Sequence, residues 1–558
     1  MTASGAQLLL AVAGERGVPV AYVTGLQMRR ASELYTAGEQ HPRKPIRLRL
    51  DLKDRRDIVD DNPLERVAPP PTHYCLSMGP PIDIDLCYLS ATEQLRLFRS
   101  GELSPVEVLK AQLDRMAVAE PAINAFTHTF EDEAMQAARA AEAVYTNRPE
   151  DARPLEGLTI TIKDEMDVKG QPNTEGSLIY KDRIATEDHP VAERLREAGG
   201  IFHARSATPE FCSAWVTTSR LHGTTRNPWN TELAPSGSSG GSGAALAAGT
   251  TTLATGSDIG GSIRGPAAAC GVVGFKPPYG RNPDISPFNL DPYCHVGPLA
   301  RTTADTALMQ NVMSGIHPKD IATLRDEMVI PTSFEGLEGK HIAWSLDVGN
   351  GVVSDEVAEQ TEKVVDALAA AGAVVEEVDL GWGPEVGEAC RDYLDHLMGA
   401  SLIRYAEQYP DLVCDYNTFY ADRAKTVTAD QFFSAFEIAG QIYEQFGPMM
   451  EQYYAFICPT LATLEMRADQ KPWDRMMVQG RDIDSDYDAC MMPVFNMLSR
   501  LPVLAVPAGV GESGVPASVQ IVARAYDDPR VFHVASALEE VMPWLDSTQR
   551  RPQLGLAS

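Results

Sequence analysis

The sequence lacks cysteine pairs and histidine motifs of the kind that build a covalent or metal framework. Its nine cysteines are odd in number and no two form a CxxC pair, which excludes a disulfide scaffold and a zinc ribbon. The eleven histidines are scattered, without HExxH or a pair at helical ligand spacing. We therefore expect no metal ion, and reduced, mostly buried cysteines, as is typical of a cytoplasmic protein.

Long hydrophobic runs and an excess of positive charge are also missing. No stretch of about 18 apolar residues occurs, so no membrane-spanning helix is expected. Residues 7–14 (QLLLAVAG) lack the basic residues that precede a secretion signal. Lys and Arg number 48 against 77 Asp and Glu, a net charge of −29 that would repel nucleic acid. The 44% hydrophobic and 22% charged content is that of an ordinary globular chain.

The first 77 residues differ from the rest. Residues 42–56 are basic and residues 69–71 are a proline run, with no periodicity that indicates a packed domain. We expect residues 1–77 to be an extension that is either poorly ordered or not part of the functional protein. The functional domain is expected to span residues 78–558.

From residue 85 onward, helix and strand signals alternate. Ser104 and Glu107 form a capping box around Pro105, and Ser90 opens a second one. Strands are expected at 157–162, 201–204, 341–346, 373–380, 503–507 and 519–523, and helices at 131–145, 191–198, 354–371 and 531–542. This order predicts an α/β fold with a large mixed sheet covered by helices on both faces. Residues 393–450 are expected to be a helical insertion that covers a substrate pocket.

Residues 235–277 form a glycine- and serine-rich segment that does not read as a linker. Its only charged residues are Asp258, Arg264 and Lys276, and apolar residues are interleaved throughout, so we expect a buried, tightly turned segment. The segment contains neither the GxxxxGK[ST] nor the GxGxxG pattern of nucleotide-binding loops. One alternative is a GxSxG nucleophile elbow at Ser239. That alternative needs a strand entering the turn, and residues 232–236 are a poor strand.

Three short motifs in this segment resemble the amidase signature family: GSSGGS at 237–242, GSDIGGSIR at 256–264 and GFKP at 274–277. Lys163, which ends the apolar run 157–162, matches the catalytic lysine of the family. The similarity extends over roughly residues 86–541. Two positions depart from the pattern, Ser236 in place of glycine and Pro278 in place of threonine, and both flank the core of the motif.

The resemblance implies that Ser262 is a nucleophile, that Ser238 relays its proton, and that Lys163 is the base. It also implies a cis peptide before Ser238. Because a charged amine is a poor base, we expect burial to lower the pKa of Lys163. The alternative from the residues alone is an ion pair of Lys163 with Asp164 or Glu165.

Backbone N–H groups before Ser262 are expected to stabilise the developing oxyanion. The residues in this role are Ile259, Gly260 and Gly261. Supporting roles around the site are expected for Ser239, Ser257, Asp258 and Arg264.

The resemblance therefore implies an amidohydrolase that cleaves the C–N bond of a linear carboxamide to a carboxylate and ammonia or an amine. The alternative is an amidotransferase A-type subunit that releases ammonia from glutamine for tRNA-linked amidation. Aromatic and methionine residues gather within 393–500, which favours an aryl or aliphatic amide. We expect a small-molecule amide substrate, a homodimer, and no cofactor, nucleic-acid or membrane partner.

Overall fold

The computed structural model describes residues 83–326, 328–349, 352–483, 486–544 and 551–554. The expected extension at residues 1–77 lies outside the described residues. No helix within the described ranges has the length and apolar content needed to cross a bilayer.

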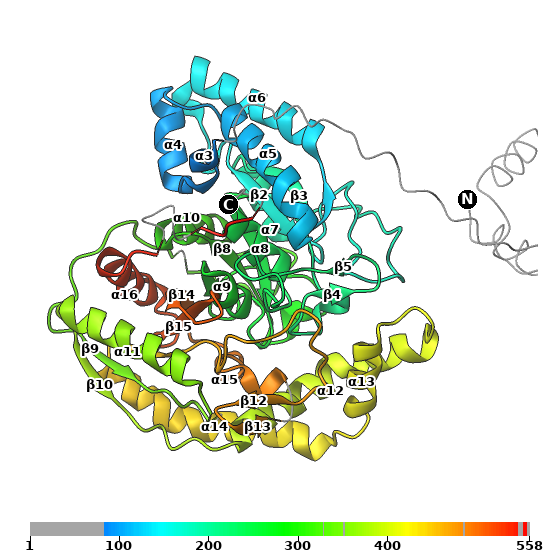
Figure 1. Ribbon diagram of the computed structural model, residues 1–558, viewed down its shortest axis with the longest axis vertical. Helices are drawn as coiled ribbons and strands as arrows, with labels where there is room; N and C mark the ends of the chain where they lie inside the picture. Colours follow the sequence, from blue (N-terminus) through cyan, green and yellow to red (C-terminus); the bar gives the residue numbers. More distant parts are fainter. Residues whose placement is uncertain (1–82, 327, 350–351, 484–485, 545–550, 555–558) are drawn as a thin grey trace, which may run out of the picture. The chain divides into compact units, whose positions relative to one another are not determined.

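Within these ranges, one sheet of eleven strands runs through the protein (Figure 1). In spatial order the strands are β1 (Phe126–Thr129), β3 (Ile201–Ser206), β2 (Thr159–Lys163), β6 (Leu253–Asp258), β8 (His295–Ala300), β7 (Val273–Lys276), β14 (Val503–Val510), β15 (Pro516–Val522), β11 (Ala455–Pro459), β9 (His341–Trp344) and β10 (Val374–Glu377). Strand β2 pairs in parallel with β3 and β6, and β9 with β10 and β11, whereas the central strands pair antiparallel. The prediction of a large mixed sheet is confirmed.

The alternation of side chains along β7 shows that helices cover both faces of the sheet. A Cβ built on Gly274 would lie 2.7 Å from Ala267 Cβ of α9 (Arg264–Cys270), so glycine allows this helix to pack closely. The next residue, Phe275, points to the other face, where its ring lies 4.8 Å from Phe532 of α16 (Asp528–Val541). The predicted two-sided α/β fold is confirmed.

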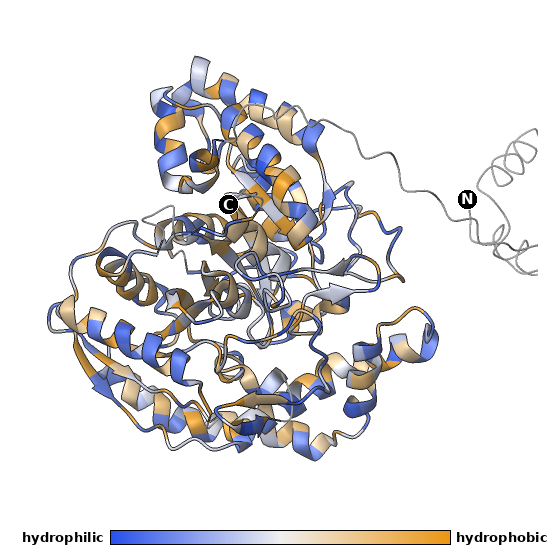
Figure 2. Ribbon diagram, viewed as in Figure 1, coloured by the Kyte–Doolittle hydropathy of each residue, from blue (hydrophilic) through white to orange (hydrophobic). Residues whose placement is uncertain are grey.

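The bounds of the remaining helices are α3 (Ile84–Tyr88), α4 (Ala91–Ser100), α5 (Pro105–Ile123), α6 (Glu131–Asn147), α7 (Pro190–Glu197), α8 (Gly240–Ala248), α10 (Thr303–Met313), α11 (Asp355–Ala370), α12 (Glu385–Gln408), α13 (Asp415–Ala424), α14 (Ala429–Gln452) and α15 (Val494–Met497). Three of them, α12, α13 and α14, pack mainly against one another. Outer helices such as α11 carry both hydrophilic and hydrophobic residues (Figure 2), as one exposed and one packed face require. Most of residues 393–450 lie in α12, α13 and α14.

The helix starts follow from capping chemistry. At α5 the Ser104 and Glu107 side chains both bond backbone N–H groups, which completes the predicted box. At α4 only half of the predicted box forms. Ser90 accepts from Glu93 N, but the Glu93 carboxylate pairs with Arg96 at 2.8 Å instead of turning back.

Gly241 in α8 is fixed by close packing, and alanine there should destabilise the fold. An added Cβ would lie 2.5 Å from Ala125 O and 2.7 Å from Ala207 O, both rigid backbone atoms. We expect Gly241→Ala to lower the free energy of unfolding by about 1–3 kcal/mol, measured by urea denaturation. The matched change Gly440→Ala meets no atom within 4 Å in α14 and should raise it by up to about 1 kcal/mol. Equal effects of the two changes would contradict the packing described here.

Candidate active site

Lys163 is the last residue of strand β2, and its side chain is fully buried. Its Nζ donates to Ser238 Oγ and to Ser257 Oγ, both at 2.8 Å, and lies 3.3 Å from Glu165 Oε1. Two N–H bonds of the ammonium are therefore used by serine hydroxyls, and the Glu165 contact is an ion pair without a hydrogen bond. The peptide between Gly237 and Ser238 is cis, as the resemblance implies.

The predicted fall in the pKa of Lys163 is wrong for this arrangement. Burial alone lowers the pKa of Lys163, but Cys212 and the Glu165 carboxylate oppose burial, and the resulting pKa lies above the ordinary value. Cys212 Sγ donates to Glu165 Oε2 at 2.6 Å. Burial and this carboxylate raise the pKa of Cys212 well above its usual range, so Cys212 and Glu165 share one proton and place a single negative charge beside Lys163. The alternative of an ion pair is confirmed for Glu165.

Ser262 lies in the turn between β6 and α9, where only 7% of its surface is exposed. Its carbonyl accepts from Ser239 N at 3.2 Å, which ties the two halves of the glycine- and serine-rich segment together. Ser262, Ser238 and Ser257 all line one cavity of about 400 Å³, called here the large cavity. The residues predicted as nucleophile and proton relay therefore open on the same space.

The turn before Ser262 is wrapped around the Asp258 carboxylate. Asp258 Oδ1 accepts from Gly261 N at 2.7 Å and Oδ2 accepts from Ile263 N at 3.2 Å. The predicted oxyanion role of Gly261 therefore needs correction, because its N–H is already bonded. Gly261 instead needs to be glycine, since its φ is +125° and an added Cβ would meet Met492 at 2.7 Å. In the described ranges, the N–H groups of this turn without a bond are those of Ile259, Gly260 and Ser262.

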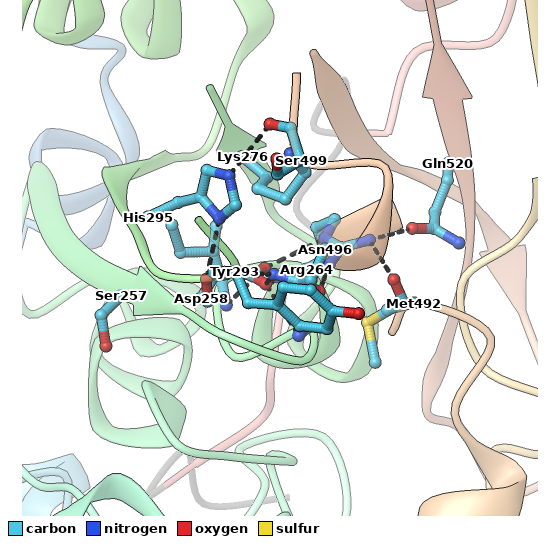
Figure 3. Close-up of polar contacts among 12 residues, drawn as sticks. Ser257, Asp258, Arg264, Lys276, Tyr293, His295, Met492, Asn496, Ser499 and Gln520 are labelled. Carbon is cyan, nitrogen blue, oxygen red and sulfur yellow. Dashed lines mark hydrogen bonds and ion pairs between the residues drawn. The ribbon is translucent and has the colours of Figure 1, made fainter. Parts of the chain in front are cut away.

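Asp258 and Arg264 form a fully buried ion pair that holds this turn (Figure 3). Arg264 Nη2 and Nε donate to the two Asp258 oxygens at 2.9 and 3.0 Å. Asn496 Nδ2 adds a bond to Asp258 Oδ1 at 2.8 Å, and Gln520 accepts from Arg264 Nη1 at 2.6 Å. Burial alone would raise the pKa of Asp258, but Arg264 and Asn496 outweigh it and hold that pKa far below its usual range.

The alternative nucleophile Ser239 is not built as an elbow. It is fully buried at the N-cap of α8, and the residues that enter this turn, 234–238, are not a strand. Its Oγ donates to Ser257 O at 3.4 Å. A nucleophile elbow also needs a downstream histidine, but His295 bonds Asp258 O and Ser499 O, and His533 bonds Tyr454 Oη and Glu335 O. Among the described residues that line the large cavity, Ser239 does not appear.

The large cavity has a mixed wall. Apolar side chains on this wall include Phe211 and Phe288, which lie in short 3-10 helices, and Leu402 of α12. Glu175 and Arg183 pair at 2.8 Å on the same wall, where burial raises the pKa of Glu175 to about 7. Within the described ranges, no cluster of three His, Cys, Asp or Glu side chains could hold a metal ion.

The aromatic and methionine residues of 393–500 lie mostly elsewhere. Tyr393, Tyr416 and Met450 are buried in the hydrophobic core, whereas Tyr420 lines a smaller cavity beside Ser262. The abundance of these residue types is thus a poor guide to the pocket wall.

A fold and site of this kind define an amidase, and comparison with known proteins agrees. The model of the Amidase family matches residues 107–532, and the chain belongs to this family. An acylamidase from Rhodococcus erythropolis is 33% identical over 469 residues, 83% of this chain and 97% of that protein. The A-type subunit of glutamyl-tRNA(Gln) amidotransferase from Carboxydothermus hydrogenoformans is 31% identical over 494 residues, with 82% and 98% covered. The crystal structure of a bacterial aryl acylamidase of the amidase signature family superposes with a TM-score of 0.75 at 28% identity, covering 83% of this chain and 97% of that one.

Proposed function

We propose that this chain is an amidohydrolase that cleaves the C–N bond of a linear carboxamide to a carboxylate and ammonia or an amine. The observation that carries the proposal is the 2.8 Å bond between Lys163 Nζ and Ser238 Oγ at the wall of the cavity that Ser262 lines. This pair gives a serine hydroxyl a route for losing its proton, which a nucleophilic serine requires. Similarity to an acylamidase supports the same reaction.

In the proposed mechanism, neutral Lys163 takes the proton of Ser238, and Ser238 takes the proton of Ser262. Ser262 Oγ attacks the amide carbonyl, and the N–H groups of Ile259 and Gly260 stabilise the oxyanion, each such donor contributing about 10²–10³ in rate. The relay then protonates the leaving amine, and water hydrolyses the acyl-enzyme. No metal ion or cofactor is required in this scheme.

The relatives favour a second candidate, the A-type amidotransferase component, and one experiment separates the two. The purified chain alone is mixed with acetamide, hexanamide, 4-nitroacetanilide and glutamine, and released ammonia or amine is measured. Unaided turnover of simple amides supports the amidohydrolase. The proposal would be overturned if glutamine were the only substrate that released ammonia, and if this release required added amidotransferase partner proteins.

We further propose that aryl or aliphatic amides are the substrates, because Phe211, Phe288 and Leu402 give the large cavity apolar walls. In this proposal residues 78–558 are the catalytic domain and 393–450 its helical insertion. A cytoplasmic location follows from the cysteine pattern, and a homodimer from the resemblance.

The raised pKa of Lys163 predicts a specific pH dependence. Since the base must be neutral, kcat/KM of the wild type should rise with pH on the alkaline side of neutrality. Burial opposes the ammonium, and Cys212 and Glu165 together favour it; Glu165→Gln removes the carboxylate of this pair and leaves the Cys212 thiol. The rising limb should therefore move to lower pH, by about 1–3 units. Glu187→Gln, which alters an exposed carboxylate paired with Lys319, should leave the profile in place. An unmoved limb in Glu165→Gln would contradict this account of the base.

A further inference from the structure

Glu175 is an acidic side chain of the large cavity that the proposed mechanism does not use. Its N–H donates to Asp164 O at 2.9 Å, and its carbonyl accepts from Phe211 N at 2.8 Å. Asp164 follows the proposed base Lys163, and Phe211 lines the same cavity. Glu175 also has a φ of +49°, a conformation that is rare for residues other than glycine and is concentrated at functional sites. The backbone therefore fixes Glu175 between the base and the cavity wall.

One oxygen of the Glu175 carboxylate is a free hydrogen-bond acceptor. Oε1 accepts from Arg183 Nη1 at 2.8 Å. Oε2 bonds none of the residues that the structure describes, and it is not a buried atom that lacks a partner. The side chain is 27% exposed and lines the large cavity. Oε2 is thus accessible on the wall of the space that Ser262 lines.

The charges around Glu175 leave an excess of negative charge. Arg183 also donates Nη2 to Asp167 at 3.1 Å, so two carboxylates share one guanidinium. Glu165 and Asp164 act on Glu175 from the loop after β2, and each of these carboxylates has a cation of its own within 4 Å. A cationic hydrogen-bond donor therefore fits the free oxygen better than an anion or an apolar group does.

We propose that Glu175 is a specificity-determining residue that binds an ammonium group at the end of an alkyl amide substrate. This inference rests on the proposed function. With the scissile carbonyl at Ser262, the alkyl chain lies along Phe211 and Leu402, and the ammonium donates to Glu175 Oε2. A primary amide releases only ammonia, which leaves the large cavity to the acyl chain. The preferred substrates are primary amides of ω-amino acids.

The test compares three pairs of primary amides in which an ammonium replaces a methyl group: 3-aminopropanamide with butanamide, 5-aminopentanamide with hexanamide, and 7-aminoheptanamide with octanamide. Ammonia release is measured at about pH 8. The wild type should prefer the amino amide of at least one pair in kcat/KM by about tenfold or more. Glu175→Gln keeps the size of the side chain and an acceptor for Arg183. It should remove most of this preference and leave the methyl-ended amide within about twofold.

The pH dependence of this preference separates a charge effect from a structural one. Burial raises the pKa of Glu175 to about 7, although Arg183 opposes it. The carboxylate is charged above that pH and protonated below it, so the preference of the wild type should decline from about pH 8 to about pH 6. The titration of Lys163 affects both members of a pair and cancels in their ratio. In Glu175→Gln the ratio should not change over this range.

Glu539→Gln is the control, because burial raises the pKa of Glu539 to about 7 as well. This carboxylate accepts from Thr303 N at 3.0 Å and is not one of the described residues that line the large cavity. The preference and its pH dependence should stay unchanged in this variant.

Three results would overturn the role of Glu175. The wild type prefers no amino amide, or Glu175→Gln slows both members of each pair equally, or the preference of the wild type persists undiminished at about pH 6. A folded wild type that hydrolyses no simple amide at all, with or without an amino group, would instead remove the proposed function, and this inference with it.

Discussion

Replacement of Ser262 by alanine is expected to reduce kcat for amide hydrolysis by at least about 10⁴-fold. Without its hydroxyl the site has no nucleophile, and only the N–H donors and substrate binding would remain to accelerate attack by water. The measurement is release of 4-nitroaniline from an anilide substrate. Circular dichroism and the melting temperature establish that the variant is folded.

Ser239→Ala is the matched control for this change. Ser239 stands next to Ser238 but is fully buried and has a hydrogen bond to Ser257 O. We expect it to retain activity within about tenfold, the cost of losing one supporting hydrogen bond. Loss of activity in Ser239→Ala together with full activity in Ser262→Ala would reverse the assignment of the nucleophile.

The second large effect is expected at Asp258. Asp258→Asn leaves the buried Arg264 guanidinium without a carboxylate, and we expect the free energy of unfolding to fall by about 3–5 kcal/mol. The same change should abolish most activity, since Asp258 also holds the N–H of Gly261 in the turn before Ser262. Urea denaturation at neutral pH measures the first effect.

Two comparisons make this prediction specific. The double variant Asp258→Asn, Arg264→Met removes the stranded charge and should recover part of the stability. Glu93→Gln, which breaks an exposed pair with Arg96, should change the stability little. If Asp258→Asn lowered the free energy of unfolding no more than Glu93→Gln does, this result would contradict a stabilising buried ion pair between Asp258 and Arg264.

The pH dependence of this pair has a definite sign. The folded protein holds the pKa of Asp258 far below its unfolded value of about 4. Its contribution to stability is therefore present above that unfolded value and is lost as the pH falls toward the folded pKa.

Sequence signals predicted those helices and strands whose conformation is specified by residues close together in the chain. The β-branched run before Lys163 became β2, and the box around Pro105 became the start of α5. The helix predicted at 354–371 is α11, which has Ser354 at its N-cap, and Gly372 follows its end with a φ of +94°. In each case the residues that specify the feature lie within one turn or one strand of it.

The centre of the fold could not be predicted in this way. Strand β6 and helices α8 and α9 are built largely from small residues, mainly glycine, alanine, serine and threonine, whose sequence pattern favours neither structure. Tertiary packing decides their conformation, because β6 lies between β2 and β8 in the middle of the sheet. The segment was predicted to be buried, but not to alternate between helix and strand.

The electrostatics of the site also depend on distant partners. Cys212 and Asn496 reach the site from 49 and 333 residues beyond Lys163, and neither stands in a motif that points there. An ion pair with Glu165 was predicted only as an alternative to a catalytic role of Lys163. In the structure, Glu165 lies 3.3 Å from Lys163, the proposed base. A single sequence indicates which residues carry the chemistry, but not which neighbours set their pKa values.

The most direct test of the proposed mechanism is covalent labelling with a fluorophosphonate, which phosphonylates activated serines. The purified wild type is treated with the reagent, and the modified serine is located by fragmentation mass spectrometry. We predict one equivalent on Ser262 in parallel with loss of activity, and no labelling of Ser262→Ala. Labelling of Ser239, or undiminished labelling of Ser262→Ala, would contradict the assignment of Ser262 as the nucleophile.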